Sequence, residues 1–446
     1  MNTEIQRMPL TKAQWPKDKG TDAARMDDQA GQDEGGPPGA LPEFRRYHPR
    51  PGDPDWPRLA REARELAARL RPKLEPPRSL VADWPRRARS QATALRNYAE
   101  NLLRHRAGRH DLLPLYFIWT THRTCNFRCE YCDDHRGRKY PDLPKEGTLG
   151  TTDGMRLLEI MRTRTPSVYF AGGEPTLRSD LPALTRRARD LAYYPITINT
   201  NGSVIHRQLE RPEWRTWLAD TDIVVVSLDR LNLESSAALW SHDRPEDVYR
   251  NLLLVRELAD EQRVKLMVNT VIQPGQVKEA WTVMDLAGDL GITFCPVPMN
   301  VGPRIHPDLL ADPDYPGFVS DLLGRRRAGE KIVGSLRMNE RLLRAAPKTC
   351  RNTLKPHIDF DGSLFWPCKS AQNLGPERIR VLDYPSVEAL YSAAKARIDP
   401  TGFHGQGPRQ CGAECNWAQN YTTDSYAHGL EHPAHLLGEV VAFLRR

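Results

Sequence analysis

Six short apolar runs, separated by segments of helical periodicity, constrain the fold of this 446-residue chain more than any other feature. Because each run is apolar on both faces, we expect strands that are buried in a parallel sheet. The segments between them carry apolar residues at helical spacing, such as Val248, Leu252 and Val255. This alternation predicts an α/β architecture with right-handed crossovers. The runs comprise residues 115–121, 167–171, 196–200, 223–228, 264–272 and 292–298.

Three cysteines lie close together after the first run, in the segment Cys125-Asn126-Phe127-Arg128-Cys129-Glu130-Tyr131-Cys132. A closed metal site needs four thiolates, so three of them in a cubane iron–sulfur cluster leave one iron without a protein ligand. One alternative is a zinc site completed by His122 or His135, although zinc ligands usually follow a C-x2-C spacing that does not repeat here. Surface thiols with no ligand role are the other alternative.

The C-x3-C-x2-C spacing, with an aromatic residue before the third cysteine, resembles the radical S-adenosylmethionine (radical SAM) superfamily. Further along, Gly172-Gly173-Glu174-Pro175 resembles the second motif of that family. The resemblance implies a partial (β/α)6 barrel over residues 111–300, with its site at the carboxyl ends of the strands. It also implies a 4Fe–4S cluster on Cys125, Cys129 and Cys132 that binds S-adenosylmethionine and yields a 5′-deoxyadenosyl radical.

The same resemblance assigns roles to residues that follow the strands. Gly172 and Gly173 are expected to let the backbone approach the methionine end of the cofactor, because neither has a Cβ. Glu174, or the backbone beside it, is expected to accept a charge-assisted hydrogen bond from the methionine ammonium group. Tyr131 is expected to pack near the adenine, or only to shield the cluster from water. Ser227 is expected to bond to the ribose hydroxyls.

Four further residues lie at or near the expected strand ends. Asn199, Asn201 and Asn269 supply neutral amide groups that a ribose or a substrate could use, or that only cap the loops that follow. Cys295 interrupts an apolar run, where a lone cysteine is usually a small core residue. The alternative is a thiol near the barrel mouth that donates a hydrogen atom to a radical.

A second set of cysteines, Cys350, Cys368, Cys411 and Cys415, follows the expected barrel. Residues 358–368 predict a hairpin with an Asp-Gly turn, whose second strand delivers Cys368. This pattern resembles the SPASM and Twitch extensions of radical SAM enzymes. With four cysteines it implies a Twitch-like α+β domain over residues 350–446, closed around a second, auxiliary 4Fe–4S cluster. A structural zinc ion on the same ligands, or incidental thiols, are the alternatives.

The N-terminal part divides into two segments. Residues 1–55 are rich in Gly, Pro and charged side chains, and we expect a disordered tail. Residues 56–110 predict a helical extension, in which Leu95, Tyr98 and Leu102 share one face among many arginines. We expect this narrow apolar face to pack on the catalytic domain. The alternative is peripheral contact with an anionic membrane. Residues 301–349 are expected to form a connecting helical segment.

Composition sets limits on location and partners. The net charge of +7 reflects 64 Lys and Arg against 57 Asp and Glu, so we expect a solvated surface and no nucleic-acid partner. No apolar run approaches the ~20 residues of a membrane span, and the N-terminus has no apolar signal segment. Eight cysteines, seven of them in two clusters, suit a reducing cytoplasm better than a disulfide framework.

The sequence therefore predicts a radical SAM enzyme that abstracts hydrogen from an unactivated carbon, in a net oxidation assisted by the auxiliary cluster. Its expected partners are an electron donor such as flavodoxin or ferredoxin, and a small-molecule or peptide substrate. A peptide or protein maturase of the SPASM type is one alternative. A zinc-stabilised binding protein without enzymatic activity is the other, although it leaves Gly172-Gly173-Glu174 unexplained.

Overall fold

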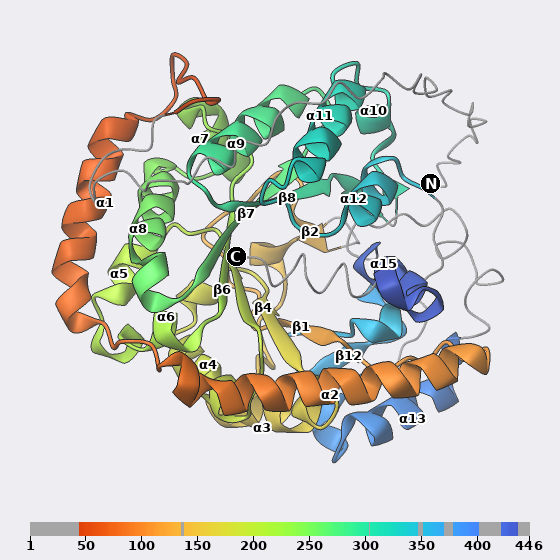
Figure 1. Ribbon diagram of the computed structural model, residues 1–446. Coiled ribbons are helices and arrows are strands. Elements are labelled where there is room, and N and C mark those ends of the chain that lie inside the picture. Colours follow the sequence, from red (N-terminus) through yellow and green to blue (C-terminus); the bar gives the residue numbers. More distant parts are fainter. Residues whose placement is uncertain are drawn as a thin grey trace. The chain divides into compact units, whose positions relative to one another are not determined.

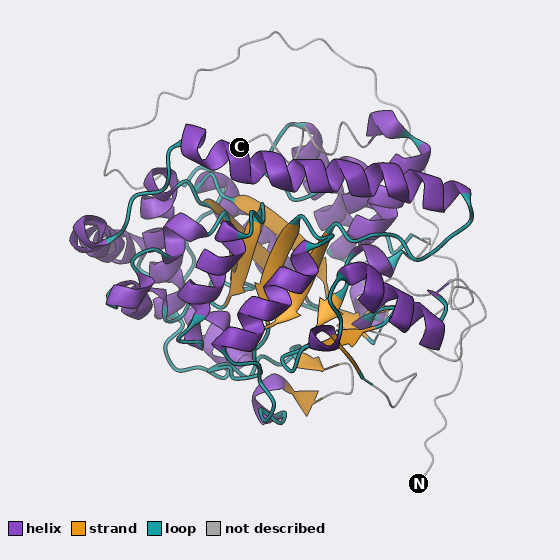
Figure 2. Cartoon of the chain, turned by 90° about the horizontal axis from the view of Figure 1, so that it is seen from below, coloured by secondary structure: helices purple, strands orange, loops and turns teal. Residues whose placement is uncertain are grey.

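The computed structural model describes residues 44–134, 138–302, 304–346, 351–369, 378–400 and 421–435. All of them belong to one compact unit, Leu41–Arg446. Strands lie together at its centre and helices surround them (Figures 1 and 2). None of the helices in these described ranges has the length and apolar character that crossing a membrane requires.

The central sheet has nine strands in the order β13-β12-β11-β1-β4-β5-β6-β7-β8. Six neighbouring strands, β1, β4, β5, β6, β7 and β8, run parallel to one another. They coincide with the six predicted runs to within one residue at each end. β8 does not pair with β1, so the barrel is open, as the prediction of a partial barrel requires. These strands are β1 (Tyr116–Thr120), β4 (Ser167–Ala171), β5 (Ile196–Thr200), β6 (Ile223–Ser227), β7 (Lys265–Ile272) and β8 (Thr293–Pro298).

Alternate side chains of these strands face two different layers. Trp119, Phe170 and Val226 belong to the large core that the surrounding helices share. Val225 and Met267 belong to a separate small cluster on the other face of the sheet. The strands therefore bury both faces, which explains why their sequences are apolar throughout. The helices that connect successive strands include α3 (Thr151–Arg162), α4 (Leu181–Asp190), α7 (Leu233–Trp240), α8 (Glu246–Gln262) and α9 (Val277–Asp289).

The predicted disordered tail is too long at its C-terminal end. Residues 1–43 lie outside the described residues, but Tyr47 is buried and its ring contacts Phe44 and Trp56 edge-on. The Tyr47 hydroxyl accepts a 2.8 Å hydrogen bond from Trp56 Nε1 and lies 2.8 Å from Asp53 Oδ2. Its backbone N–H donates to Asp289 Oδ2 of α9 at 2.9 Å. Two aromatic residues thus fix residues 44–55, despite the polar composition around them.

The predicted helical extension is confirmed as α1 (Trp56–Leu70) and α2 (Leu80–Arg106). Figure 1 shows α2 lying across the lower end of the sheet. Its contacts there are polar: Ser90 Oγ lies 2.9 Å from the carbonyl oxygen of Pro166, and Asn97 Nδ2 donates to that of Pro114 at 2.9 Å. Pro166 directly precedes β4 and Pro114 lies two residues before β1, so α2 closes the ends at which the strands begin.

A buried ion-pair network fixes the first turns of α2. The Arg86 guanidinium donates to Asp83 of its own helix at 2.7 and 2.9 Å, and to Asp222, the residue before β6, at 2.8 and 2.6 Å. Arg189 of α4 donates to Asp83 at 2.7 Å. Burial acts to raise the pKa of Asp83, but hydrogen bonds from Arg86 and Arg87 and the charge of Arg189 hold that pKa well below its ordinary value.

The predicted apolar face of α2 is only partly buried. Tyr98 and Leu102 pack against a small core that includes Leu112 and Leu430, as expected. The prediction is wrong for Leu95, because its side chain is 69% exposed. The polar contacts set the rotation of the helix and turn Leu95 outward. We call the exposed set the apolar stripe; it comprises Leu80, Val81, Trp84, Leu95 and Leu103.

The predicted C-terminal hairpin is confirmed as β11 (His357–Ile358) and β12 (Ser363–Phe365), with Gly362 in the turn at φ +79°. β13 (Ile379–Arg380) pairs with β12. β11 also pairs in parallel with β1, so the hairpin extends the main sheet. Cys368 follows β12 and is buried, whereas Cys350, Cys411 and Cys415 lie outside the described residues. The separate domain over residues 350–446 stays a prediction.

Other helices complete the described part of this unit. They include α10 (Pro307–Leu310), α11 (Tyr315–Arg327) and α12 (Leu336–Leu343) in the segment where a helical connection was expected, with α13 (Val387–Arg397) and α15 (Tyr421–Glu431) beyond it. Asp424 of α15 accepts from Arg341 of α12 at 2.9 Å, which ties the C-terminal helix to that segment.

Replacing Asp83 with alanine should destabilise the protein by about 3–5 kcal/mol, because Arg86 and Arg189 would lose a buried counter-ion. Urea unfolding at neutral pH measures this loss. The folded-state pKa of Asp83 lies below its unfolded value of about 3.9, so its stabilisation is present above that pH and disappears as the pH falls below it. The difference between wild type and variant should therefore shrink toward pH 2. Gln91→Ala, exposed on the same helix, should change stability by less than about 0.5 kcal/mol.

Candidate functional site

The three clustered cysteines lie on a loop, residues 125–132, that follows β1, and all three are half-buried. The loop rests on the end of α7: the backbone N–H groups of Arg128 and Glu130 donate to the carbonyl oxygens of Trp240 and Leu239 at 2.9 and 3.1 Å. The Phe127 ring stacks on Trp240, with centroids 5.4 Å apart. The apolar and charged residues between the cysteines therefore anchor the loop. We call residues 125–132 the cysteine loop.

The Gly172-Gly173 pair lies directly against the residues that lead into the cysteine loop. Backbone N–H groups of Gly173 and Glu174 donate to the carbonyl oxygens of His122 and Thr124, both at 2.8 Å. A Cβ on Gly172 would lie 2.6 Å from His122 O, and one on Gly173 would lie 2.1 Å from Thr124 O. The close backbone contacts within the protein therefore require glycine at both positions. The further role of these glycines toward a cofactor stays a prediction.

The Glu174 carboxylate is 1% exposed and joins the ends of β4 and β5. Its Oε1 accepts from the Thr176 N–H at 2.9 Å, the Thr176 hydroxyl at 2.5 Å and the Thr200 hydroxyl at 2.6 Å, and its Oε2 accepts from the Asn201 N–H at 2.5 Å. Burial raises the pKa of Glu174, while these donors act in the opposite direction. The Glu174 carbonyl accepts from His122 Nε2 at 2.9 Å. Glu174 thus positions the chain, and its predicted bond to a methionine ammonium stays untested.

Asn201 connects the end of β5 to the cysteine loop. Its Nδ2 donates to Asn126 Oδ1 at 2.9 Å, while its Oδ1 accepts from the Ser203 N–H at 3.0 Å. Asn126 Nδ2 donates in turn to the Ser203 hydroxyl at 2.9 Å. Asn201 therefore caps the loop that follows β5, and its expected bond to a ribose or a substrate stays a prediction. Asn126 is a residue that sequence reasoning missed, although it lies inside the cysteine motif.

Tyr131 is held by a buried carboxylate at the end of β6. Its hydroxyl donates to Asp229 Oδ2 at 2.6 Å, while Asp229 Oδ1 accepts from the Val271 N–H at 2.8 Å. The indole Nε1 of Trp240 also donates to Asp229 Oδ2, at 3.3 Å. Burial raises the pKa of both Tyr131 and Asp229. Asp229 was visible in the sequence only as part of a strand end, and its anchoring role came from the structure.

The predicted polar residues of β5 to β8 lie on the face of the sheet opposite the helices. Ser227, Asn269 and Cys295 are direct neighbours in the strand register. Two residues lower in the register, on the same face and level with Val225, Asn199 Oδ1 is buried and has no hydrogen-bond partner among the described residues. A buried amide oxygen without a donor suits a ligand with hydroxyl or amino groups. Burial raises the pKa of Cys295 to about 12, which keeps its thiol protonated.

The thiols of the cysteine loop suit a cluster better than a single ion. One zinc ion with bonds of ~2.3 Å would bring tetrahedral thiolates to ~3.8 Å of one another. In the described part of the chain, the Sγ atoms of Cys125, Cys129 and Cys132 do not all lie within 4.8 Å of one another. His122, one of the two predicted zinc ligands, already donates to the Glu174 carbonyl, and the other, His135, lies outside the described residues. Three thiols on one loop are the donor set that a cubane with one open iron would use.

The C-terminal hairpin lies beside the cysteine loop. Arg123 donates to Asp359 Oδ2 at 2.8 Å, and its guanidinium lies 3.8 Å from the centroid of the Phe360 ring. Lys369, next to Cys368, donates to the Tyr140 hydroxyl. Burial acts to lower the pKa of Lys369, but Tyr140, Asp359 and Cys132 together raise it. The strand that delivers Cys368 and the cysteine loop are therefore neighbours.

Comparison with known proteins agrees with this geometry. Residues 119–287 match the family model described as the radical SAM superfamily. Fe-coproporphyrin III synthase of Methanosarcina barkeri is 34% identical over 21% of this chain and 23% of that protein. GTP 3′,8-cyclase of Mycobacterium marinum is 36% identical over 34% of this chain and 40% of that protein. The chain spans between 23% and 53% of the length of the first curated relatives it matches.

One solved structure with a similar chain path is Streptococcus suis SuiB bound to S-adenosylmethionine. The sequence identity is 18% and the TM-score is 0.48, over 72% of this chain and 73% of that chain.

Replacing Gly173 with alanine should displace the cysteine loop, because the new Cβ would collide with the Thr124 carbonyl oxygen. We expect reconstituted protein to hold at least about fourfold less iron on Cys125, Cys129 and Cys132, measured as the cluster signal in electron paramagnetic resonance after reduction. Gly150→Ala is the matched control, since a Cβ there meets no atom within 4 Å and the backbone has φ −70°. Full cluster occupancy in both variants would contradict the inferred role of Gly173.

Proposed function

We propose that this chain, whose residues 119–287 match the radical SAM family model, cleaves S-adenosylmethionine reductively and abstracts hydrogen from an unactivated carbon. The observation that carries the proposal is a loop of three thiols, held in place by the Gly172-Gly173-Glu174 motif. Cys125, Cys129 and Cys132 would hold a 4Fe–4S cluster whose open iron binds S-adenosylmethionine. The cluster would supply one electron to S-adenosylmethionine, and the reductive cleavage gives methionine and a 5′-deoxyadenosyl radical.

The chain's own residues would orient the cofactor and keep water away. Tyr131, within the cysteine loop, donates to Asp229, which also accepts from Trp240, so this tyrosine would stay in place beside a bound cofactor. Ser227 and Asn269 present neutral polar groups in one row of the sheet, suited to ribose hydroxyls or a substrate. Asn199 Oδ1 offers a buried acceptor two residues lower in the register. Neutral groups of this kind bind by hydrogen bonds and have no acidic proton near pH 7 to give to an intermediate.

The second part of the proposal is a net oxidation. Cys350, Cys368, Cys411 and Cys415 would saturate an auxiliary 4Fe–4S cluster, leaving no iron open to the substrate. Such a cluster is suited to accept one electron from the substrate radical that hydrogen abstraction leaves. The contact between Arg123 and Asp359 supports this role, because it joins the hairpin that leads to Cys368 to the segment that leads into the cysteine loop. An electron donor such as flavodoxin or ferredoxin would supply the first electron.

We favour a small-molecule substrate over a peptide. The curated relatives are named as a GTP 3′,8-cyclase and an Fe-coproporphyrin III synthase, names that refer to small molecules. In the described residues that precede β1, the N-terminal segment is helical, and α2 uses its inner face to close the sheet. A peptide maturase of the SPASM type remains the second candidate. We propose a cytoplasmic location, where an oxygen-sensitive cluster is protected.

Anaerobically reconstituted protein should hold about eight irons per chain, from two cubane clusters. Replacing Cys125, Cys129 and Cys132 together with alanine should leave about four irons and abolish formation of 5′-deoxyadenosine. Iron analysis and chromatography of the nucleoside measure the two results. Eight irons in the triple variant, or zinc in place of iron in the wild type, would sink the proposal.

Replacing Cys411 and Cys415 with alanine should uncouple the two halves of the reaction. We expect about four irons and continued formation of 5′-deoxyadenosine, but loss of the oxidised product. The wild type should consume one S-adenosylmethionine per turnover. An unchanged product yield from a folded double variant that lacks the second cluster would exclude electron transfer through it and leave a structural role.

A further inference from the structure

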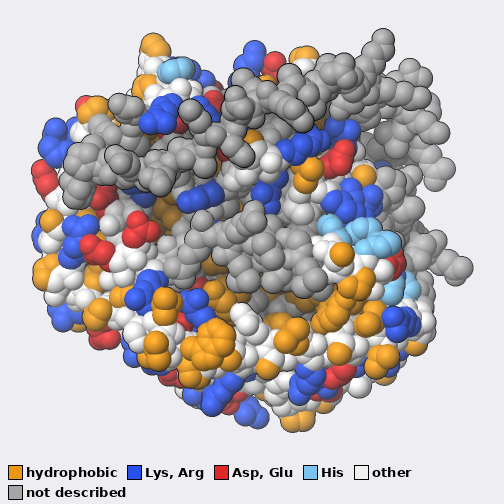
Figure 3. Space-filling model, in the orientation of Figure 1, with side chains coloured by type: hydrophobic (Ala, Val, Ile, Leu, Met, Phe, Trp, Pro, Cys, Tyr) orange, Lys and Arg blue, Asp and Glu red, His pale blue; other side chains and the backbone are white. Residues whose placement is uncertain are grey.

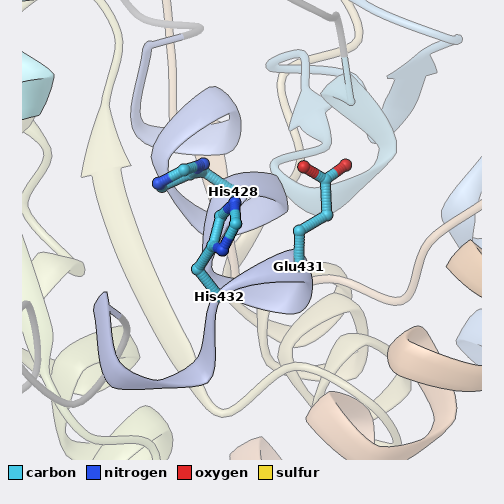
Figure 4. A group of neighbouring side chains, drawn as sticks. All are labelled: His428, Glu431 and His432. Atoms are coloured by element: carbon cyan, nitrogen blue, oxygen red, sulfur yellow. The ribbon is translucent and has the colours of Figure 1, made fainter.

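Imidazole and carboxylate groups gather at the end of α15, on a part of the protein that the proposed reaction does not use. The ligand atoms of His428, Glu431 and His432 all lie within 4.8 Å of one another (Figure 4). Positions i, i+3 and i+4 share one helix face, which explains their proximity. The ring of His435 lies 4.8 Å from that of His428, centroid to centroid. Figure 3 shows the histidines as one patch on the surface.

We propose that His428, Glu431 and His432, with His435 as a fourth candidate ligand, bind one zinc ion or a divalent ion of similar preference. Imidazole nitrogen and carboxylate oxygen bind zinc at ~2.0–2.2 Å, so tetrahedral ligands lie ~3.3–3.6 Å apart. The ligand atoms now lie within 4.8 Å of one another, and rotation of the side chains would bring them to the separation of tetrahedral ligands. Three imidazoles and one carboxylate leave a divalent ion with a net charge of about +1, and they lack the thiolates that would favour an iron–sulfur cluster.

The groups around the site would orient its ligands. Glu431 Oε1 lies 3.2 Å from Nε2 of His105, which belongs to α2. The Ser425 hydroxyl lies 3.2 Å from Nε2 of His435. Contacts of this kind hold metal ligands in a fixed orientation. A bound ion would therefore fasten the end of α15 beside α2.

The test uses the full chain with its iron–sulfur clusters loaded, exposed to an equimolar amount of zinc sulfate and then desalted. We expect about one zinc per chain by mass spectrometry, with only nitrogen and oxygen neighbours in zinc-edge X-ray absorption. His428→Gln with His432→Gln should lose at least about tenfold in zinc affinity. His48→Gln, at an exposed histidine of the N-terminal segment, should retain it.

Hydrogen exchange gives a second readout that does not depend on activity. Zinc should slow exchange of residues 421–435 by about tenfold in the wild type and not in the double variant. Equal zinc content in the two proteins, sulfur neighbours at the zinc edge, or no retained zinc would each overturn the proposal. None of these outcomes bears on cleavage of S-adenosylmethionine, so the proposed function stands or falls separately.

An independent observation concerns the apolar stripe on α2. Seven large apolar side chains are exposed in the described part of the chain, and five of them are the stripe residues, exposed by 53% to 85%. Figure 3 shows hydrophobic side chains along the lower part of the surface, where Figure 1 places α2. Arg89, Arg96 and Arg106 are exposed on the same helix. Of its two acidic residues, Asp83 is buried and Glu100 pairs with Arg164 at 2.6 Å.

We infer that the apolar stripe docks on an anionic lipid surface. A helix that lies in a membrane interface combines an apolar face with flanking cations and an aromatic residue, here Trp84. Like charges on Arg89, Arg96 and Arg106 disfavour pairing with a second copy of the helix. The stripe lies where the strands begin, and the cysteine loop lies where they end. Docking would therefore leave the mouth of the barrel directed away from the lipid.

Sedimentation with vesicles tests this surface. The full chain should bind vesicles that contain phosphatidylglycerol at least about tenfold more tightly than vesicles of phosphatidylcholine alone, and salt should weaken the binding. Trp84→Ser with Leu95→Ser should remove most of it, while Leu310→Ser, exposed on α10, should not. Equal binding by the double variant, or none by the wild type, would overturn the inference. Capture of an acidic protein without vesicle binding would also overturn it, in favour of a protein partner.

Discussion

The candidate site depends on one close approach between two segments of backbone. Residues 172–174 continue the pairing of β4 with β1 past the ends of both strands, through hydrogen bonds from Gly173 and Glu174 to residues 122 and 124. Only glycine permits this distance, since a Cβ at either position would overlap a carbonyl oxygen. The contact sets the direction in which the chain leaves β1. The three thiols follow within a few residues, so their placement is decided here.

Glu174 extends this constraint to the next strand. Four donors from Thr176, Thr200 and Asn201 surround its carboxylate, so the ends of β4 and β5 cannot move independently. A buried carboxylate without such donors would cost several kcal/mol. A motif that the family resemblance connects with cofactor binding is thus already fully engaged within the protein. A cofactor would therefore have to bind the Glu174 carboxylate in addition to these four donors, or bind the backbone nearby.

The opposite end of the sheet shows why sequence patterns predicted the strands better than α2. Six runs that are apolar on both faces correctly predict six parallel strands, because burial on both sides leaves one interpretation. The periodicity of α2 identifies a helix, but it assumes that the apolar side faces inward. The loops that enter the strands present carbonyl oxygens that need donors, and Ser90, Asn97 and Arg86 supply them. Polar residues therefore face inward, and Leu95 faces outward.

The hairpin after residue 350 marks a second limit of sequence reasoning. Its strands and its Asp-Gly turn were predicted, yet local sequence does not say which strand a hairpin will join. β11 pairs with β1, the strand that also carries the cysteine loop. The path to Cys368 starts from β12 and the path to Cys125 from β1, which are separated only by β11 in the same sheet. Arg123 and Asp359 join the segments that follow β1 and β11. Under the proposed function, the sheet would therefore hold Cys368, one of the four expected ligands of the auxiliary cluster, at a fixed place relative to the cysteine loop.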